Sequence, residues 1–533
     1  MEKEGELGTE GFWAKQIAEE AIGHFPGKQV INGGWSPSGD FHIGNAREII
    51  TAYAIHHHLQ IIGEDSELKF VIDNFDSFDR IPSTMKSYKN TLRPFLGKPI
   101  NQIPDPTGQS ESYADRFSMT FVEAMQDWGL DVNIHYASEM YKAGLYDEYL
   151  KLFLEKEEEI QQIMEKVAGN RLDSFVNVVC TNCGNLRTTT LLGIDGEKLI
   201  FKCETKREFK GCGFQGETSI NEHNWKLKWR LDWPARQKFL GVTVEPAGKD
   251  HSVAGGSIDT TIEIHRKIFN ATPPIMPRYG FITMKGKKLS GSKGTGIPAK
   301  DLRKLLDPQA YFFLVFKNDL RKDVDFNYMS PDYMKLVDEF VMSRRMLNGY
   351  QYPGTTRQLE KLKMAVRLAL KDKEVKVIPA DISTSELLLI YQITLRDKNK
   401  TIEKFKELGK IKPEDSLIEL SSRLDQTSYW LDKYAPNAIK FKVLNSPPEK
   451  AREVWDAKMQ ELWLSILDQI KEEMSKDDVM ALIRDTAKSY DIPIKSVFQA
   501  FYLLLLGKTA GPNAAQFLLT LGTEKVKQMI NLL

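Results

Sequence analysis

The sequence predicts an α/β head followed by a helical tail. Residues 28–32 form a short apolar stretch that enters a Gly-rich loop, a helical pattern covers about 43–59, and a second apolar run spans 68–73. Strand, loop, helix and strand in this order are the opening of a parallel α/β sheet. After residue 300, helical patterns interrupted by prolines continue to the last residue, which indicates a helix-rich region.

The stretch between these two parts changes character twice. Residues 141–167 are charged and have a helical pattern, which indicates helices with a solvated face. Residues 175–219 consist of short β-like pieces around the cysteines. Residues 225–284 return to α/β character, with predicted strands at 242–246 and 279–284.

Length and composition are those of a soluble globular protein. The 533 residues suggest roughly three to four domains. Lys+Arg and Asp+Glu both total 73, and this balance does not exclude a nucleic-acid partner, because phosphate binding needs only a local basic surface. Residues 1–20 contain no secretory signal, and the longest apolar run, 497–506, is too short for a membrane span. We therefore expect a soluble cytoplasmic protein; the oligomeric state is undetermined, with a monomer as the expectation.

All four cysteines lie close together in the chain. Cys180 and Cys183 form a tight knuckle followed by a glycine, while Cys203 and Cys212 form a second, wider pair. In a reducing compartment such a cluster indicates metal ligands rather than disulfides, and four thiolates close a tetrahedral structural zinc site. We predict Zn²⁺ in a module at about 175–219. The alternative is a similar module with free thiols and no metal.

The first Gly-rich loop, residues 33–45, precedes the first predicted helix. Backbone N–H groups at the start of a helix can face an anion, and small residues let a nucleotide approach the backbone. His42 and Asn45 can donate to phosphate oxygens, and Gly44 leaves room for a purine and ribose. Taken alone, the loop is equally consistent with an ordinary Gly/Ser-rich turn.

A second loop, residues 284–296, is basic and Gly-rich and follows a predicted strand. Its lysines would neutralise the charge that builds on a leaving pyrophosphate, and its glycines would let the loop close. The alternative is a solvated basic turn that contacts an RNA backbone.

Together, the two loops resemble the paired ATP signatures of class I aminoacyl-tRNA synthetases. His42-Ile43-Gly44-Asn45 matches the first signature, with Asn45 in place of the usual final histidine. Lys288-Leu289-Ser290-Gly291-Ser292 matches the second, with Gly291 where many class I enzymes carry a second lysine. The resemblance implies ATP, with Mg²⁺, bound by Ser38, His42, Gly44, Asn45, Lys288, Leu289, Ser290, Gly291 and Ser292. It implies His42, Asn45, Lys288 and Lys293 as the catalytic residues.

Further blocks resemble the class I lysyl-tRNA synthetases. They are residues 34–39, 229–236, 245–251 and 289–294 in the head and, more loosely, 430–436 and 506–509 in the tail. The family implies ligation of lysine to tRNA(Lys) through a lysyl-adenylate, with release of AMP and pyrophosphate. It places Gly34, Ser36, Trp229, His251 and Tyr279 in the amino-acid pocket; core packing is the alternative for each aromatic residue.

The same resemblance implies a division of the chain into five parts. These are a Rossmann-type catalytic domain in two halves (1–95 and 226–300), an inserted zinc-bearing connective domain (96–225), a stem-contact region (301–380) and an all-α helix cage that binds the anticodon (381–533).

Three rival functions and two smaller questions stay open. The rivals are another class I synthetase of the glutamyl type, a small-molecule nucleotidyltransferase, which would not explain the helical tail, and a non-catalytic tRNA-binding paralogue. Asp73, Asp76 and Asp79 follow a predicted strand and would hold Mg²⁺ or a substrate amine, but a solvated turn is favoured. No second zinc site is expected at 106–112, because Gln109 and Ser110 are poor ligands.

Overall fold

The computed structural model describes residues 12–289, 296–471 and 473–533. The chain forms two compact units. The first contains the residues up to Phe326 together with Gln351–Asp372, and the second contains Asn327–Tyr350 and Lys373–Leu533. All candidate site residues of the sequence belong to the first unit, and Ser290, Gly291, Ser292 and Lys293 lie outside the described residues.

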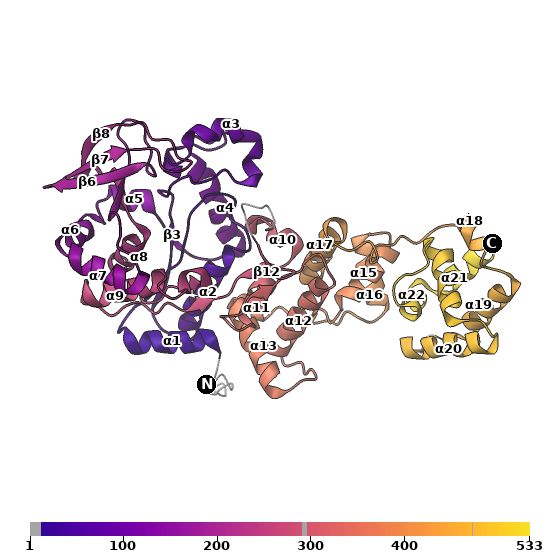
Figure 1. Cartoon of the computed structure of the whole chain (residues 1–533). Coiled ribbons are helices and arrows are strands. Elements are labelled where there is room, and N and C mark those ends of the chain that lie inside the picture. Colours follow the sequence, from indigo (N-terminus) through magenta and orange to yellow (C-terminus); the bar gives the residue numbers. More distant parts are fainter. Residues whose placement is uncertain (1–11, 290–295, 472) are drawn as a thin grey trace. The chain divides into compact units, whose positions relative to one another are not determined.

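The first unit is built on a parallel sheet (Figure 1). β3 (Ser66–Ile72) pairs with β1 (Gln29–Ile31) and β2 (Gly34–Trp35) along one edge and with β4 (Asn133–Tyr136) along the other. Beyond β1, residue Val244 makes parallel bridges to Ile31 and Ile275. β10 (Ala247–Gly248) then pairs in parallel with β11 (Arg278–Tyr279). The predicted parallel α/β sheet is confirmed, with the strand at 242–246 reduced to a bridge.

Helix α2 (Ala46–Ile61) follows the Gly-rich loop, and the first signature lies immediately before its first residue. It contacts α1 (Trp13–His24), β3 and α11 (Pro308–Phe316), so nearly all of its side chains are buried. A helix covered on all sides holds its N-terminus firmly in place, and this rigidity is what a phosphate-facing loop requires.

The segment between β4 and β9 (Trp225–Leu227) is an insertion with its own structure. It begins with α5 (Ala137–Lys142), α6 (Asp147–Glu155) and α7 (Glu157–Ala168), whose exposed Glu157–Glu159 turn confirms the predicted solvated face. β5 (Val176–Val178) pairs antiparallel with β9 and so closes the base of the module. Between them, β6 (Thr189–Asp195), β7 (Lys198–Cys203) and β8 (Gln215–Ser219) form an antiparallel meander at one edge of the unit (Figure 1).

The predicted loop at 284–296 starts as a hairpin. β12 (Ile282–Met284) pairs with β13 (Lys287–Lys288) through a two-residue turn in which Lys285 and Gly286 have φ values of 52° and 71°. Two consecutive positive φ values define the type I′ turn that suits a tight hairpin, and glycine adopts the second at little cost. β12 also pairs in parallel with β14 (Val324–Asp325).

The remaining elements of the first unit are short or connect the sheet. They are η1 (Ser83–Tyr88), α3 (Lys89–Leu92), η2 (Arg93–Phe95), η3 (Ile100–Gln102), α4 (Tyr113–Trp128), η4 (Ile220–Glu222), α8 (Trp229–Phe239), η5 (Lys249–Ser252), α9 (Ser257–Lys267), η7 (Ala299–Asp301), α10 (Leu302–Leu305) and α13 (Thr356–Ala369). α4 has clear sequence signals at both ends, because Ser112 and Asp115 form a capping box and Gly129 ends the helix with φ 65°.

The described part of the second unit is helical. Its helices are α12 (Asp332–Leu347), α15 (Thr384–Ile393), α16 (Lys398–Glu407), α17 (Leu417–Lys433), α18 (Glu449–Arg452), α19 (Ala457–Gln469), α20 (Lys476–Ser489), α21 (Ile494–Leu506), α22 (Ala514–Leu521) and α23 (Thr523–Ile530), and α14 (Asp372–Val375) stands at the boundary. Trp463 stacks on Phe501 at 4.7 Å in its core. The predicted helix-rich tail is confirmed. Among the described residues, no helix has the length and apolar character that a membrane crossing requires.

Candidate active site

His42 sits in a tight turn just before α2. Its Nδ1 accepts hydrogen bonds from the backbone N–H groups of Gly44 (3.0 Å) and Asn45 (3.3 Å), so Nε2 carries the ring proton. Burial, assisted by the charge of Lys288, lowers the pKa of His42 to about 4. The ring is therefore neutral near pH 7 and offers a single N–H donor at Nε2, which suits a phosphate oxygen.

The first signature lies beside the described residues at both ends of the second loop. The backbone N–H of Ile43 donates to the carbonyl of Ile297 (3.0 Å), and His42 and Pro298 form an antiparallel bridge. A Cβ atom added at Gly44 would lie 2.8 Å from Cε1 of His42 and 3.2 Å from Cβ of Leu289, and one added at Gly296 would lie 2.9 Å from the His42 ring. Glycines from both stretches thus close around one imidazole, because any side chain would displace it.

Lys288 shares an aromatic ring with a second lysine. Its Nζ lies 3.5 Å from the centroid of the Phe281 ring and 3.2 Å from Oδ2 of Asp250. Lys249 lies 4.6 Å from the same centroid, and its Nζ is 2.7 Å from both carboxylate oxygens of Asp323. Exposed ion pairs of this kind contribute only about 0–1 kcal/mol, so both ammonium groups are available to a more strongly charged ligand.

Two other predicted residues of the first loop, Asn45 and Ser38, each accept a hydrogen bond from the protein itself. Oδ1 of Asn45 accepts a long hydrogen bond from the backbone N–H of His42 (3.4 Å), which turns this side chain back onto its own loop. Ser38 is exposed, and its carbonyl accepts from the hydroxyl of Tyr113 (2.9 Å).

A pocket of about 530 Å³ lies beside this loop. Its apolar wall is a cluster of rings, in which Trp229 stacks on Trp233 at 5.3 Å and His251 lies 5.8 Å from each indole. Four of the five residues predicted for an amino-acid pocket line it: Gly34, Ser36, Trp229 and His251. The fifth, Tyr279, does not line it, is buried, and donates a hydrogen bond to Glu48, which does line the pocket.

Glu48 lines the pocket from α2. Oε1 accepts a hydrogen bond from the backbone N–H of Gly34 (2.6 Å), and Oε2 accepts one from the hydroxyl of Tyr279 (2.9 Å). Within the described ranges, no ion pair joins Glu48 to a cation, and burial raises the pKa of its carboxyl to about 8. A carboxyl group in this state is mostly protonated near pH 7, and the arrival of a cationic ligand would favour its ionised form. Sequence reasoning missed Glu48, which stands as an ordinary polar residue in a helical pattern.

Buried charges also line the pocket, and they correct one expectation. Nζ of Lys226 lies 2.7 Å from both carboxylate oxygens of Asp73, so the predicted solvated acidic turn is wrong for Asp73. Asp76 lies 3.7 Å from the same ammonium group and accepts a hydrogen bond from the Ser36 hydroxyl (3.2 Å). Asp79, further along, is exposed as expected.

Arg236 is a second buried cation that the sequence did not reveal. It lies 3.9 Å from both Asp232 and Glu245, and its guanidinium is 5.4 Å from the Trp229 ring. Both Lys226 and Arg236 are surrounded by carboxylates that keep them charged despite burial. Local sequence patterns do not show that these two cations are buried, because burial of a charge depends on partners distant in the sequence.

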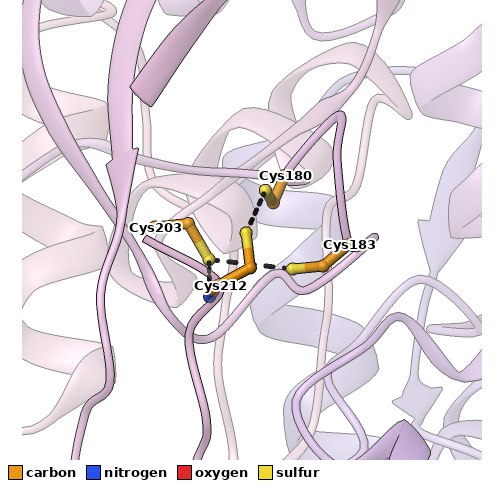
Figure 2. A group of neighbouring side chains, drawn as sticks. All are labelled: Cys180, Cys183, Cys203 and Cys212. Carbon is orange, nitrogen blue, oxygen red and sulfur yellow. Dashed lines mark hydrogen bonds between the residues drawn. The ribbon is translucent and has the colours of Figure 1, made fainter. Parts of the chain in front are cut away.

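The four cysteines form one compact group (Figure 2). Their sulfur atoms all lie within 4.8 Å of one another, and the pairs Cys180–Cys212 and Cys183–Cys203 are each 3.7 Å apart. Sulfur ligands at about 2.3 Å from a tetrahedral metal would be about 3.8 Å apart, whereas a disulfide would bring them to about 2.05 Å. The spacing is that of a structural metal site. Thr188 and the backbone N–H of Cys212 lie 3.1 and 3.4 Å from the Cys203 sulfur, as partners of a metal-bound thiolate do.

Known proteins resemble the chain over nearly its full length. Residues 11–369 match the family described as tRNA synthetases class I (K), and residues 400–532 match the anticodon binding domain. The lysine–tRNA ligase of Archaeoglobus fulgidus is 30% identical over 97% of this chain and 99% of its own length. That of Thermococcus kodakarensis is 33% identical, with 98% and 99% covered. A solved glutamate–tRNA synthetase from Elizabethkingia anophelis covers 95% of this chain and 99% of its own, with 14% identity and a TM-score of 0.39, too weak a likeness to carry an argument.

The parallel sheet, the Cys₄ insertion and the helical C-terminal region define a class I aminoacyl-tRNA synthetase fold. Within that class, the chain belongs to the lysine family.

The packing of Gly44 against His42 yields a test. Gly44→Ala places a methyl group 2.8 Å from the imidazole, so the ring must move, and we expect ATP–pyrophosphate exchange to fall at least about tenfold. The matched control is Gly39→Ala in the same loop, where the nearest neighbour of the new Cβ is Pro82 at 3.9 Å, an ordinary contact. Equal activity of the two variants would contradict the proposed constraint.

Proposed function

We propose that the chain ligates lysine to tRNA(Lys) through a lysyl-adenylate, with AMP and pyrophosphate as products. Membership of the lysine family supports this function. The observation that carries it within the structure is Glu48, a buried carboxylate without a counter-ion that faces a pocket walled by two indole rings. Lysine combines an apolar butyl stem with a cationic end, and such a pocket matches both.

The chemistry needs no protein nucleophile. The lysine carboxylate attacks the α-phosphate of ATP, the bond to the bridging oxygen breaks, and pyrophosphate leaves. The terminal ribose hydroxyl of tRNA then attacks the acyl carbon, and AMP leaves. Catalysis in such a reaction is positioning together with stabilisation of phosphate charge, to which Mg²⁺ bound with ATP contributes.

The phosphates would lie between the two signature stretches. The Nε2–H of His42 donates to a phosphate oxygen from one side, with Asn45 beside it, and Lys288 approaches from the other side. Lys293 and Ser290 to Ser292 complete the proposed set and lie outside the described residues. The exposed ion pair between Lys288 and Asp250 is weak enough to be exchanged for phosphate.

A zinc ion is the proposed occupant of the Cys₄ group. Four thiolates at tetrahedral spacing are the donor set that a structural zinc prefers, and its role would be to hold the knuckle and the 204–211 loop together. Metal analysis should find one zinc per chain, and Cys183→Ser should lose it together with several degrees of melting temperature. A protein that is fully folded with no bound metal would contradict this assignment.

We also propose the five-part division of the chain. The match of residues 400–532 to an anticodon binding domain supports the last part, in which residues 381–533 bind the anticodon. Footprinting of bound tRNA should show protection of the anticodon by this region; protection confined to the acceptor end would contradict it.

The function itself is tested by ATP–pyrophosphate exchange with each of the twenty amino acids, with and without tRNA(Lys). We expect exchange with lysine alone. Exchange with glutamate would favour the glutamyl-type alternative. No exchange under either condition would favour a non-catalytic tRNA-binding paralogue.

Lys288 is the proposed catalytic lysine that lies within the described residues, and its replacement should lower the rate of exchange with little effect on lysine binding. Lys288→Ala removes a cation that acts on charge developing in the transition state, so we expect kcat of exchange to fall about a hundredfold. The KM for lysine should change less than about threefold, because the residue does not line the pocket. Lys287→Ala, in the same strand and also exposed, is the control. A variant that only raises the KM for lysine would contradict this role.

Glu48→Gln should have the opposite kinetic effect to Lys288→Ala, on the binding of lysine rather than on the rate. The amide keeps the size of the side chain but removes the charge that faces the ammonium group, so we expect the KM for lysine to rise at least about tenfold. The KM for ATP should stay within about threefold. Tyr279→Phe removes one hydrogen bond to Glu48 and should show a smaller change in the same direction. An unchanged KM for lysine in Glu48→Gln would exclude Glu48 as the ammonium partner.

A further inference from the structure

Lys249 is a cation beside the second signature that the proposed catalytic set does not include. It lies in η5, and its side chain is 45% exposed. Its Nζ is 4.6 Å from the centroid of the Phe281 ring, and Nζ of Lys288 is 3.5 Å from the same centroid. One ring at the start of the hairpin therefore attracts two ammonium groups that come from distant parts of the sequence.

The η5 turn and the hairpin interlock through two ion pairs. Lys249 and Asp250 are neighbours in the sequence, and each has a different partner. Oδ2 of Asp250 is 3.2 Å from Nζ of Lys288, whereas Nζ of Lys249 is 2.7 Å from both carboxylate oxygens of Asp323. Asp323 also accepts a hydrogen bond from the backbone N–H of Phe281 (2.7 Å). Lys249 is thus connected to the hairpin both by the ring and by this carboxylate.

The backbone on either side of Phe281 is tightly packed. The N–H of Gly280 donates to the carbonyl of Leu320 (2.9 Å), and the N–H of Val324 donates to the carbonyl of Phe281 (2.8 Å). A Cβ atom added at Gly280 would lie 2.3 Å from the backbone of Lys322, so the loop before β14 lies directly against this strand. The ring that the two lysines share is therefore held in a fixed position.

Asp323 does not depend on Lys249 alone. Burial raises the pKa of Asp323, but hydrogen bonds from Lys249 and the Phe281 N–H, together with the charges of Lys249 and Arg47, outweigh burial and lower it. Arg47 is a buried residue of α2 that donates to the carbonyl of Leu320 (3.1 Å). If Lys249 moved away, the carboxylate would keep a backbone donor and the influence of a buried cation. Exposed ion pairs contribute little to stability, so the release of Lys249 to a phosphate costs little.

The position of Lys249 agrees with the proposed path of the phosphates. Burial lowers the pKa of His42, and the charge of Lys288 lowers it further, so this lysine is close enough to act on the imidazole. A Cβ atom added at Gly44 would lie 3.2 Å from Cβ of Leu289, the residue after Lys288. Since Lys249 shares the Phe281 ring with Lys288, it lies beside the cation that approaches the triphosphate.

The leaving pyrophosphate calls for more than one cation. Within the described residues, the second signature contributes a single lysine, Lys288. Position 291 is a glycine in this chain, where many class I enzymes carry a second lysine. Charge that develops on phosphate oxygens in the transition state is stabilised by cations placed in advance. A lysine from outside the signature would supply such a charge.

We propose that Lys249 is a further catalytic residue, which leaves Asp323 when ATP binds and donates from Nζ to the oxygens of the leaving pyrophosphate. The inference rests on the proposed function. In that step, the bond between the α-phosphorus and the bridging oxygen breaks, and its electron pair stays on the pyrophosphate. The ammonium group stabilises this charge and keeps its own protons. Its effect therefore belongs to adenylate formation and not to the transfer of lysine to tRNA, in which no pyrophosphate takes part.

The test uses two variants and one control. Lys249→Met removes the charge and keeps much of the length of the side chain. Asp323→Asn removes the partner's charge but keeps an oxygen that can accept from the Phe281 N–H. The control is Lys322→Met, which removes a cation from an exposed position next to Asp323. ATP–pyrophosphate exchange measures adenylate formation, and preformed lysyl-adenylate mixed with tRNA(Lys) measures transfer alone.

We expect kcat of exchange to fall at least about tenfold in Lys249→Met and to change less than about twofold in Asp323→Asn and in the control. The KM for lysine should change less than about threefold in Lys249→Met, because Lys249 does not line the lysine pocket. If the ion pair only fixed the hairpin, Lys249→Met and Asp323→Asn would lose rate alike, and this result would overturn the proposal. Slower transfer from preformed adenylate in Lys249→Met would overturn it as well.

A binding measurement separates this proposal from the function on which it rests. Calorimetric titration with pyrophosphate and Mg²⁺ needs neither an amino acid nor turnover. Lys249→Met should bind pyrophosphate at least about fivefold more weakly than the unaltered protein, and the control should bind it within about twofold. Equal binding by Lys249→Met and the unaltered protein would overturn the proposal, even with lysine-specific exchange. If the unaltered protein activated no amino acid, the proposed function would fall, and the titration would still report whether Lys249 contacts pyrophosphate.

Discussion

The site depends on one close packing arrangement, the imidazole of His42 held between glycines from two distant stretches. Gly44 and Gly296 leave no room for a Cβ, and the backbone around residues 41–43 pairs with residues 297–299. Because Nδ1 is occupied by two backbone donors, the ring presents only Nε2–H. The tautomer follows from these two hydrogen bonds and the position from the packing, while burial and the charge of Lys288 keep the ring neutral.

The pocket beside it combines a buried carboxyl group with an apolar wall, the two features that the proposed lysine substrate requires. Lys226 and Arg236 have carboxylate partners, whereas Glu48 forms no ion pair within the described residues and accepts hydrogen bonds from two neutral donors. An ammonium group that entered the pocket would therefore find at Glu48 a carboxyl group that no described cation contacts. The indole pair of Trp229 and Trp233 gives the alkyl stem an apolar surface, so charge and shape act on different parts of the same ligand.

The predictions that succeeded rested on local patterns. The Gly-rich loop before α2, the parallel order of the first strands, the cysteine knuckle and the helical tail all have signals within a few residues of one another. The failures have a common cause. Asp73 looked like part of a solvated turn because its partner, Lys226, follows 153 positions later. In the sequence, Glu48 resembles a surface residue, since the sequence of α2 does not show that other elements cover the helix on every face. The assignment of Tyr279 to the amino-acid pocket stays a prediction, since its hydroxyl donates to Glu48, which lines the pocket.

The ion pair between Asp73 and Lys226 also bears on how such enzymes diversify. Asp73 follows β3 of the sheet, while Lys226 belongs to β9, the strand that closes the insertion. Removing one member of a buried pair leaves the other uncompensated, at a cost of about 3–5 kcal/mol. The chain that returns from the insertion is therefore fixed to the sheet by a buried charge pair. A chimera that exchanged β9 for a segment without a cation at this position would leave the buried carboxylate of Asp73 unpaired, so these two strands constrain each other.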